Sequence, residues 1–378
     1  IKQPFILKRP GNLHIFIGPN NAGKTNILDA IYQIYNEDDK RLLHQKENLE
    51  IIFKLKSKFG KKFSVLQDKN KKIFKIDGKK IGGSKAKTIL NYHIIRLCAT
   101  KPFDLDKLQI IYEHFLTKFP KLFKIFRDTL LKHFPEINST KDFFKEKNIK
   151  EFGKMRPFER LGAGFQQVFV ILMYLFNPQY TILLLEEPEI HLHPAMVKKL
   201  LKVMERENLD NQIFLTTHSP IFIRPTNLHR IFRVMKEEGT TKVYSPRLAG
   251  KRINYNRLIQ ELNAENCEMF FADKVLLVEG PSDHILMRGL IDRFYKGDKE
   301  VKVIQVYGKS NIDIYTDLLE IFNIPYLVLL DRDALYDTGL KIVQNKIKKQ
   351  FTRPEKNLID FLKKYNVYIF PNSGIEMN

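Results

Sequence analysis

One stretch near the start of the chain has the residue types and spacing of a phosphate-binding loop. Residues 18–25 read GPNNAGKT and stand between an apolar run and a helical pattern. Such a loop uses glycines to expose backbone N–H groups to phosphate oxygens, Lys24 to reach the β- and γ-phosphates, and Thr25 to ligate Mg²⁺. The pattern predicts an ATP site. Its candidate residues are Gly18, Asn20, Asn21, Gly23, Lys24, Thr25 and Asn26.

Two acidic residues follow a later apolar run at the position where nucleotide chemistry is expected. The run 181–185 leads directly into Glu186 and Glu187. At the carboxyl end of a sheet strand, Glu186 would hold Mg²⁺ through water and Glu187 would polarise the attacking water. The alternative is a pair of surface acids at a strand end. His218 follows the next apolar run, 212–216, and either contacts the γ-phosphate or is a core histidine.

A second group of acids follows two apolar runs in the last third of the chain. Glu279 comes after the run 274–278, and Asp331 and Asp333 come after the run 326–330. Carboxylates at neighbouring strand ends can converge on one or two Mg²⁺ or Mn²⁺ ions, which prefer oxygen ligands. Two such ions would support phosphodiester hydrolysis without a side-chain nucleophile. Chance acidity at strand ends is the alternative.

The first half of the chain supplies elements that would position the loop. Residues 14–17 read as a strand, and residues 24–34 as the helix that follows it. From 49 to about 95 apolar and charged residues alternate, which predicts an antiparallel meander. Its thirteen lysines between Lys54 and Lys87 are either a solvated face or a surface for phosphates. Residues 104–137 have helical spacing, interrupted by prolines.

The second half begins a new α/β pattern after a polar stretch at 240–257. The continuous apolar runs ahead of this stretch, 181–185 and 212–216, are typical of buried parallel strands. We therefore place a domain boundary near 264–272. The elements expected beyond it, besides the two strands named above, are helices at 283–294 and 312–322 and a strand at 301–306.

Composition limits the class of protein. The 378 residues predict about two domains, and 43% hydrophobic residues exclude a disordered or fibrous chain. A net charge of +21 favours a polyanionic partner, although a Lys-rich surface can serve solubility alone. The longest apolar run, 168–176, is too short to cross a membrane, and Cys98 and Cys267 are too few for a disulfide framework. We expect a cytoplasmic protein. The absence of an initiator methionine before Ile1 is consistent with a trimmed chain.

The first group of motifs resembles the ABC-type ATPases of SMC-like and recombination proteins. The wording GPNNAGKTN, LGAGFQQ at 161–167, LLLEEPEIHLHP at 183–194 and TTHSP is similar to the overcoming-lysogenization-defect (OLD) family. The resemblance implies a head-to-tail ATPase dimer in which Gly164 of one subunit completes the ATP site of another. Ala163 replaces a serine that is common in the family signature, which puts γ-phosphate sensing in doubt. His191 and His193 are expected to have structural or interface roles rather than to bind a metal.

The second group of motifs resembles the TOPRIM domain of topoisomerases, primases and OLD nucleases. The resemblance implies an α/β chain with an ABC/SMC-like P-loop ATPase domain at 1–265 and a Rossmann-like TOPRIM domain at 270–378. It also implies a helical dimerisation insertion near 104–152. Mapped onto this sequence, the implied metal ligands are Glu279, Asp283, Asp331, Asp333 and Glu376. Lys309 would neutralise charge on a phosphate, or else be a solvated loop lysine.

Together the motifs predict an ATPase joined to an Mg²⁺- or Mn²⁺-dependent endonuclease. It would cut or nick DNA in defence against phage or plasmids, as a homodimer or higher oligomer with a helicase or other defence partner possible. The alternatives are an ATP-switched nucleic-acid-binding protein that does not cut, and a TOPRIM effector that acts on RNA. A topoisomerase is disfavoured because no nucleophilic tyrosine on a separate domain is evident. No membrane contact is expected.

Overall fold

The computed structural model describes residues 12–33, 49–54, 62–68, 71–76, 78–85, 94–134, 144–151, 153–206, 211–246, 262–263, 265–335, 341–342, 344 and 355–370. Its internal contacts divide the chain into two compact units. We call them the N-terminal unit, mainly residues 23–217, and the C-terminal unit, mainly residues 218–378. Residues 17–22 of the phosphate-binding loop belong to the C-terminal unit. The two units are described separately.

A buried parallel sheet forms the centre of the N-terminal unit. Its strands lie in the order β1 (Leu13–Ile17), β11 (Gln212–Thr216), β10 (Ile182–Glu186) and β6 (Ile94–Cys98). The apolar runs predicted as buried parallel strands are confirmed, because β10 and β11 are neighbours in parallel register. Helix α1 (Lys24–Gln33) follows the loop, also as predicted.

The antiparallel meander is confirmed, but it ends earlier than predicted. Its strands pair in sequence order: β2 (Leu49–Lys54), β3 (Lys62–Asp68), β4 (Lys71–Ile76) and β5 (Lys79–Ile81). The predicted end near residue 95 is wrong, since Ile94–Cys98 is β6 of the parallel sheet. An alternating pattern cannot distinguish a meander strand from an edge strand that has one polar side.

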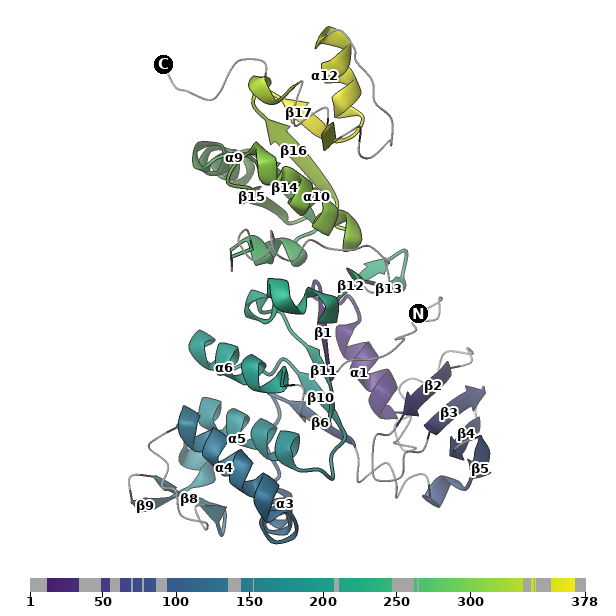
Figure 1. The fold of residues 1–378 in the computed structure, drawn as a ribbon, viewed down its shortest axis with the longest axis vertical. Coiled ribbons are helices and arrows are strands. Elements are labelled where there is room, and N and C mark those ends of the chain that lie inside the picture. Colours follow the sequence, from purple (N-terminus) through teal and green to yellow (C-terminus); the bar gives the residue numbers. More distant parts are fainter. Residues whose placement is uncertain are drawn as a thin grey trace. The chain divides into compact units, whose positions relative to one another are not determined.

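Three helices of the N-terminal unit lie close together (Figure 1), and aromatic side chains make contacts between them. Helix α3 (Leu105–Lys118) begins at Asp104, whose carboxylate accepts a hydrogen bond from the Lys107 amide. Pro120 starts α4 (Pro120–His133) at a position where its missing N–H costs nothing. Both helices contact α5 (Ala163–Phe176) through Phe169. The remaining elements here are β7 (Phe144–Lys145), β8 (Asn148–Glu151), β9 (Lys154–Pro157), η2 (Phe158–Arg160) and α6 (Pro194–Met204).

The C-terminal unit contains a four-stranded parallel sheet in the order β15 (Val301–Gln305), β14 (Lys274–Val278), β16 (Tyr326–Leu330) and β17 (Val367–Ile369). Helices α9 (Pro281–Phe294) and α10 (Ile312–Ile321) connect its strands (Figure 1). The α/β pattern predicted for residues 274–330 is confirmed. Helix α12 (Glu355–Lys363) precedes β17.

Short elements complete this unit. The hairpin of β12 (Ile231–Glu237) and β13 (Thr240–Tyr244) lies ahead of the parallel sheet in sequence, so the polar stretch predicted from residue 240 begins with a strand. Short 3₁₀ helices are η3 (Pro220–Phe222), η4 (Pro225–Arg230), η5 (Asn266–Phe270), η6 (Lys309–Asn311) and η7 (Arg332–Ala334). Among the described residues, no helix is long and apolar enough to span a membrane.

Candidate functional site

The phosphate-binding loop has the backbone geometry that its sequence predicts. Gly18 and Gly23 have φ angles of 140° and 96°, in a region that favours glycine, and Asn21 has a φ of 60°. The Lys24 side chain is buried at the start of α1. Burial lowers the pKa of Lys24 to about 8, although Glu187 and Glu189 act to raise it. The negative oxygens of a bound phosphate would stabilise the charged form of Lys24 and raise its pKa again.

The two residues predicted to hold Mg²⁺ at the nucleotide site are in direct contact. Thr25 donates a hydrogen bond from Oγ1 to Glu186 Oε1 over 2.9 Å. Arg96, from the neighbouring strand β6, donates from Nη2 to Glu186 Oε2 over 3.0 Å and also pairs with Asp29 of α1. Burial acts to raise the pKa of Glu186, but the bonds from Arg96 and Thr25 hold it below its usual value. The carboxylate is therefore fixed as an anion beside the hydroxyl.

Sequence reasoning missed Arg96. A signal was available, because this arginine interrupts the apolar residues of 94–97. A charged side chain inside such a strand needs a partner, and carboxylates at the end of the adjacent strand are the natural candidates. The pairing of β6 with β10 brings Arg96 opposite Leu184 and near Glu186. No sequence motif predicts this pairing.

Other predicted nucleotide residues lie at the ends of the same strands. Glu187 directly follows β10, its amide donates to Thr216 O over 3.0 Å, and its φ is 48°. Its charge acts on Lys24, which places the two side chains at one site. His218 is half-buried two residues beyond β11. Asn26 is exposed in the first turn of α1, and Asn20 and Asn21 are exposed in the loop.

The glycine-rich signature has a local packing role as well as its expected nucleotide role. Gly164 lies in the first turn of α5, where a Cβ atom would come within 2.8 Å of the His191 carbonyl oxygen. The neighbouring Ala163 is exposed. His193 caps α6, because its Nδ1 accepts a hydrogen bond from the Ala195 amide over 3.3 Å. The His193 side chain therefore has a structural contact at the start of α6, whereas the contact at His191 involves only its backbone carbonyl.

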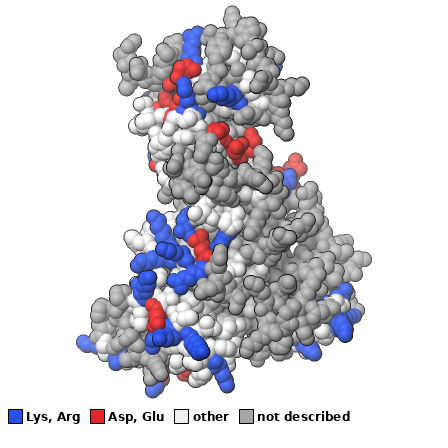
Figure 2. All heavy atoms as spheres, viewed as in Figure 1, with Lys and Arg blue, Asp and Glu red and all other residues white. Residues whose placement is uncertain are grey.

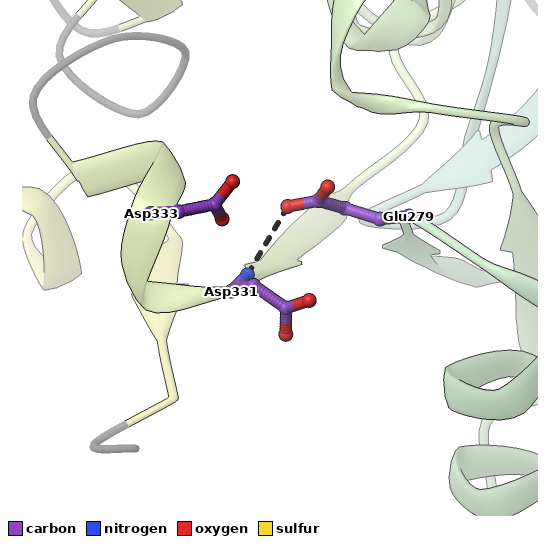
Figure 3. Close-up of side chains that lie close together, drawn as sticks. All are labelled: Glu279, Asp331 and Asp333. Carbon is purple, nitrogen blue, oxygen red and sulfur yellow. Dashed lines mark hydrogen bonds between the residues drawn. The ribbon is translucent and has the colours of Figure 1, made fainter. Parts of the chain in front are cut away.

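Three of the predicted metal-binding acids converge in the C-terminal unit. Glu279 follows β14, Asp331 follows β16, and Asp333 lies in η7. One ligand oxygen of each lies within 4.8 Å of the others (Figure 3). Because β14 and β16 are parallel neighbours, their carboxyl ends meet at one edge of the sheet. The Asp331 amide also donates to Glu279 Oε1 over 3.1 Å.

The electrostatics of this cluster favour a cation. Burial, followed by repulsion from Asp331 and Asp333, raises the pKa of Glu279. Burial, followed by repulsion from Asp283 and Asp333, raises the pKa of Asp331. Asp331 Oδ1 is buried and has no hydrogen-bond partner within the described part of the chain. An unpartnered carboxylate oxygen among three acids fits Mg²⁺ or Mn²⁺, which are hard cations with oxygen ligands.

The other residues predicted for this site take different places. Lys309 Nζ donates to Asp333 Oδ2 over 2.7 Å, which places the lysine at the exposed edge of the cluster. Asp283 is outside the three-acid group, and its Oδ2 accepts from the Gly280 amide over 3.2 Å. Its charge still reaches Asp331. Glu376 lies outside the described residues. The Gly308 amide bonds to Glu279 O over 3.1 Å and holds the lysine loop at the end of β14.

Comparison with known families finds three matching models. Residues 75–224 match the model described as "AAA domain, putative AbiEii toxin, Type IV TA system". Residues 4–92 match a second model described as "AAA domain". Residues 270–333 match the model "Overcoming lysogenization defect protein-like, TOPRIM domain". The last match begins before Glu279 and ends at Asp333, so it covers the three-acid cluster.

Individual relatives include two proteins named as nucleases. The chain is 29% identical over 202 residues to "Endonuclease GajA" of Bacillus cereus strain VD045, covering 51% of this chain and 34% of that protein. It is 27% identical over 193 residues to "OLD nuclease" of Thermus scotoductus, covering 47% and 36%. The matches span only 25% to 40% of the curated relatives' own lengths. A solved SMC head bound to the C-winged helix domain of ScpA aligns with a TM-score of 0.45 and 16% identity, over 62% of this chain and 90% of that one.

Proposed function

We propose that this chain, which joins an AAA-type ATPase domain to an OLD-like TOPRIM domain, is a metal-dependent endonuclease that cuts or nicks DNA under the control of ATP. The observation that carries the proposal is the convergence of Glu279, Asp331 and Asp333 at the ends of adjacent parallel strands. The raised pKa values of Glu279 and Asp331, and the Asp331 oxygen that has no partner among the described residues, are the properties of a site that binds a divalent cation. The relatives named as nucleases support the same function.

In the proposed reaction the three acids hold Mg²⁺ or Mn²⁺ at the edge of the sheet. Asp283 and Glu376 are proposed as further ligands. The bound metal would supply an activated water and stabilise the leaving oxygen of a phosphodiester. Lys309, fixed by Asp333, would place its ammonium group beside the phosphate and neutralise developing negative charge. No serine, cysteine or histidine nucleophile is needed.

The ATPase half is proposed to bind ATP at the loop and to hydrolyse it. Lys24 would contact the β- and γ-phosphates, Thr25 and Glu186 would hold Mg²⁺, and Glu187 would orient the attacking water. His218 would contact the γ-phosphate. A second copy of the chain would contribute Gly164 to the site in a head-to-tail dimer, with the segment 104–152 assisting dimerisation. The exposure of Ala163 at the start of α5 supports this arrangement, since a partner could reach it.

A basic surface of the N-terminal unit supports nucleic acid as the substrate. Lysine and arginine side chains gather over α6 in Figure 2, and the exposed residues are Lys132, Lys198, Lys199, Lys202 and Arg206. The pKa of His133 is lowered by burial and then by the charges of Lys199, Lys132 and Arg206. The effect of these three charges shows that His133 lies close to them. No ion pair engages these five side chains within the described ranges. We propose that this surface contacts phosphates.

The biological setting is proposed from the same relatives. A nuclease governed by an ATPase suits defence against phage or plasmid DNA in the cytoplasm, with a helicase as a candidate partner. The ATPase site would restrict when the TOPRIM site acts on nucleic acid. An uncontrolled endonuclease would endanger the cell's own DNA, so dependence on a nucleotide state has a clear use.

The decisive experiment is cleavage of supercoiled plasmid with Mg²⁺ or Mn²⁺, with and without ATP. We expect nicking or linearisation by the native protein and by Asp298→Ala, an exposed acid of the same unit. The double variant Asp331→Ala, Asp333→Ala should bind ATP but leave the plasmid whole. Lys24→Ala should lose ATP binding and ATP control.

The outcomes separate the remaining alternatives. If the native protein hydrolyses ATP but leaves plasmid whole while it cleaves RNA in the same buffer, the RNA-effector function replaces the proposed one. If neither nucleic acid is cut although both are bound, the chain is an ATP-switched binding protein. Loss of ATP hydrolysis in a folded Asp331 variant would contradict two chemically separate sites.

A further inference from the structure

Arg233 of β12 is fully buried although it carries a charge. Its guanidinium group donates four hydrogen bonds, all to backbone carbonyl oxygens of the C-terminal unit. Nε reaches Phe270 O over 3.1 Å and Nη2 reaches Ala272 O over 3.0 Å, while Nη1 reaches Phe322 O over 3.2 Å and Asn323 O over 3.0 Å. Strand β12 belongs to the sequence ahead of the TOPRIM domain, whereas all four acceptors lie within it.

The four acceptors lie at the ends of two elements that lead to the metal site, ahead of β14 and at the C-terminal end of α10. Phe270 and Ala272 lie four and two residues before the start of β14, which ends at the residue before Glu279. Phe322 and Asn323 lie at the C-terminal end of α10, where a helix carries partial negative charge that favours a cation. The opposite end of α10 continues from η6, which contains Lys309. One side chain therefore holds the ends of two elements that lead to the acids and to the lysine.

The same hairpin touches the phosphate-binding loop. A Cβ atom on Gly18 would lie 2.1 Å from the carbonyl oxygen of Val234, the residue after Arg233. Thr241 of β13 donates from Oγ1 to the Ala22 carbonyl over 3.4 Å. Residues 17–22 and 218–378 form one compact unit, so these contacts lie within a single body. Strand β12 thus meets the nucleotide loop with its backbone and the TOPRIM domain with a buried side chain.

A buried arginine is a specific choice at this position. Burial lowers the pKa of Arg233 to about 10, which still leaves the group charged at neutral pH. An apolar side chain could fill a buried strand position without the desolvation penalty of a charge. The guanidinium instead fixes relative positions, because its planar set of donors binds four backbone carbonyl groups at once. Asn323 adds a second link, since its Nδ2 donates to Glu237 Oε1 of β12 over 3.1 Å.

We propose that Arg233 is a positioning residue that couples nucleotide occupancy of the phosphate-binding loop to the geometry of the TOPRIM metal site. A shift of the loop on binding phosphate would move β12. Because the Arg233 guanidinium is bonded to the residues before β14 and to the C-terminal end of α10, these parts would move with it. The regulatory part of this inference rests on the proposed function. The physical link does not require that the site cut DNA.

The test is hydrogen–deuterium exchange of the whole chain with and without a non-hydrolysable ATP analogue and Mg²⁺. In the native protein, analogue binding should change exchange in residues 270–278 and 312–323. In Arg233→Met and Arg233→Lys that response should disappear, while the response of the phosphate-binding loop remains. The lysine variant keeps the charge but cannot bind four carbonyl groups. It therefore tests the proposal even if the methionine variant does not fold.

Tyr315→Phe is the matched control. It removes the 2.7 Å hydrogen bond from Asn266 Nδ2 to Tyr315 Oη, which also joins η5 to α10 but does not involve β12. This variant should keep the nucleotide response. An Arg233 variant that still transmits the response, or a native TOPRIM domain that never responds, would overturn the proposal.

Plasmid cutting provides the second readout. Coupled sites typically change each other's affinity by about 5- to 150-fold, and we expect the effect of ATP on cutting to disappear in the Arg233 variants. Cutting without ATP is the reference for each variant, so the ratio of the rates with and without ATP reports the coupling. If the native protein does not cut at all but shows the exchange response, the proposed nuclease function fails while the role of Arg233 stands.

Discussion

At the scale of single residues, carboxylates in this chain occupy two opposite environments. Hydrogen bonds from Arg96 and Thr25 hold the pKa of Glu186 below its usual value in spite of burial. Burial and two neighbouring acids instead raise the pKa of Glu279. Glu186 is therefore a stable anion before any metal arrives, whereas the TOPRIM acids repel one another until a cation joins them. Metal binding should affect folding stability mainly through the second site.

Replacement of Asp331 by asparagine tests this difference. A carboxyl group with a raised folded pKa destabilises the fold when ionised, and this cost is absent below the ordinary pKa of an acid and complete above the raised value. Near neutral pH in EDTA, Asp331→Asn should therefore melt higher than the native protein. The amide donation from Asp331 to Glu279 is a backbone bond and survives.

The same variant should lose stabilisation by metal. Mn²⁺ at 100 times its Kd would stabilise a native site by about 2.7 kcal/mol, and Asp331→Asn should show little of this gain. Thermal unfolding with EDTA or Mn²⁺ measures both effects, with Asp298→Asn as the control. A full Mn²⁺ shift in Asp331→Asn would remove Asp331 from the ligand set.

Lys24 gives the nucleotide site a defined pH dependence. Because its pKa is about 8, the free protein loses this positive charge as pH rises through that value. ATP favours the charged lysine, so above pH 8 binding must also take up a proton. We expect affinity for a fluorescent ATP analogue to fall by up to about tenfold per pH unit above about pH 8, and to level off below it.

Lys24→Arg is the control for this pH profile, since arginine stays protonated throughout the range. If the variant binds the analogue, its affinity should not change between about pH 7 and 9. Equilibrium fluorescence titration at fixed Mg²⁺ measures both profiles. A flat native profile would show that Lys24 is fully charged before ATP arrives.

At the scale of elements, α5 depends on one aromatic core. The Phe169 side chain is fully buried. Its ring contacts come from α3, α4, β7, η2 and α5 itself, and the partners are Tyr112, Phe126, Phe144, Phe158 and Phe165. The aromatic residues of α3 and α4 therefore pack within the N-terminal unit.

Phe169→Ala should destabilise the N-terminal unit by about 3–5 kcal/mol, because it removes a large ring and leaves a cavity. Urea unfolding followed by far-UV circular dichroism measures the change, since the chain has no tryptophan. Ile110→Ala is the control on α3, where Ile110 is 66% exposed, and it should change stability by less than about 0.5 kcal/mol. A destabilisation below about 1 kcal/mol for Phe169→Ala would mean that the core closes around the cavity.

Elements that carry a motif were predictable, and those held by distant partners were not. The strands before Glu187 and Glu279 are short apolar runs that end in acidic residues, so the sequence predicted the strands and the acids at their ends. Strand β6 has no such ending, and its place was decided by pairing with β10. Arg96 and Arg233 were missed for the same reason, because their partners are 37 to 90 residues away. No periodicity encodes such contacts.

At the scale of the whole molecule, the charge of +21 is a property of binding rather than of the fold. If the basic surface over α6 contacts phosphates, replacing Lys198, Lys199 and Lys202 by glutamine should weaken DNA binding and flatten its salt dependence. The slope of log K against log salt should fall by about 0.9 for each phosphate that the variant no longer neutralises. Fluorescence anisotropy with labelled duplex at several salt concentrations measures the slope.

The control replaces Lys296 and Lys299, which are exposed in the C-terminal unit. Both variants reduce net charge, so a general effect of charge would flatten the slope in each. A specific surface would flatten it much more per lysine in the α6 variant. Equal changes per lysine would remove α6 from the binding surface.

The backbone conformation of Glu187 has a consequence for the engineering of this protein. Its φ of 48° is a left-handed backbone conformation that costs a non-glycine residue about 1 kcal/mol. A design method that optimises heat resistance would choose glycine there and would obtain a sturdier chain without the carboxylate. If Glu187 orients the attacking water as proposed, stability and ATP turnover compete at this position, and libraries selected for thermal tolerance alone should accumulate folded proteins that no longer hydrolyse ATP.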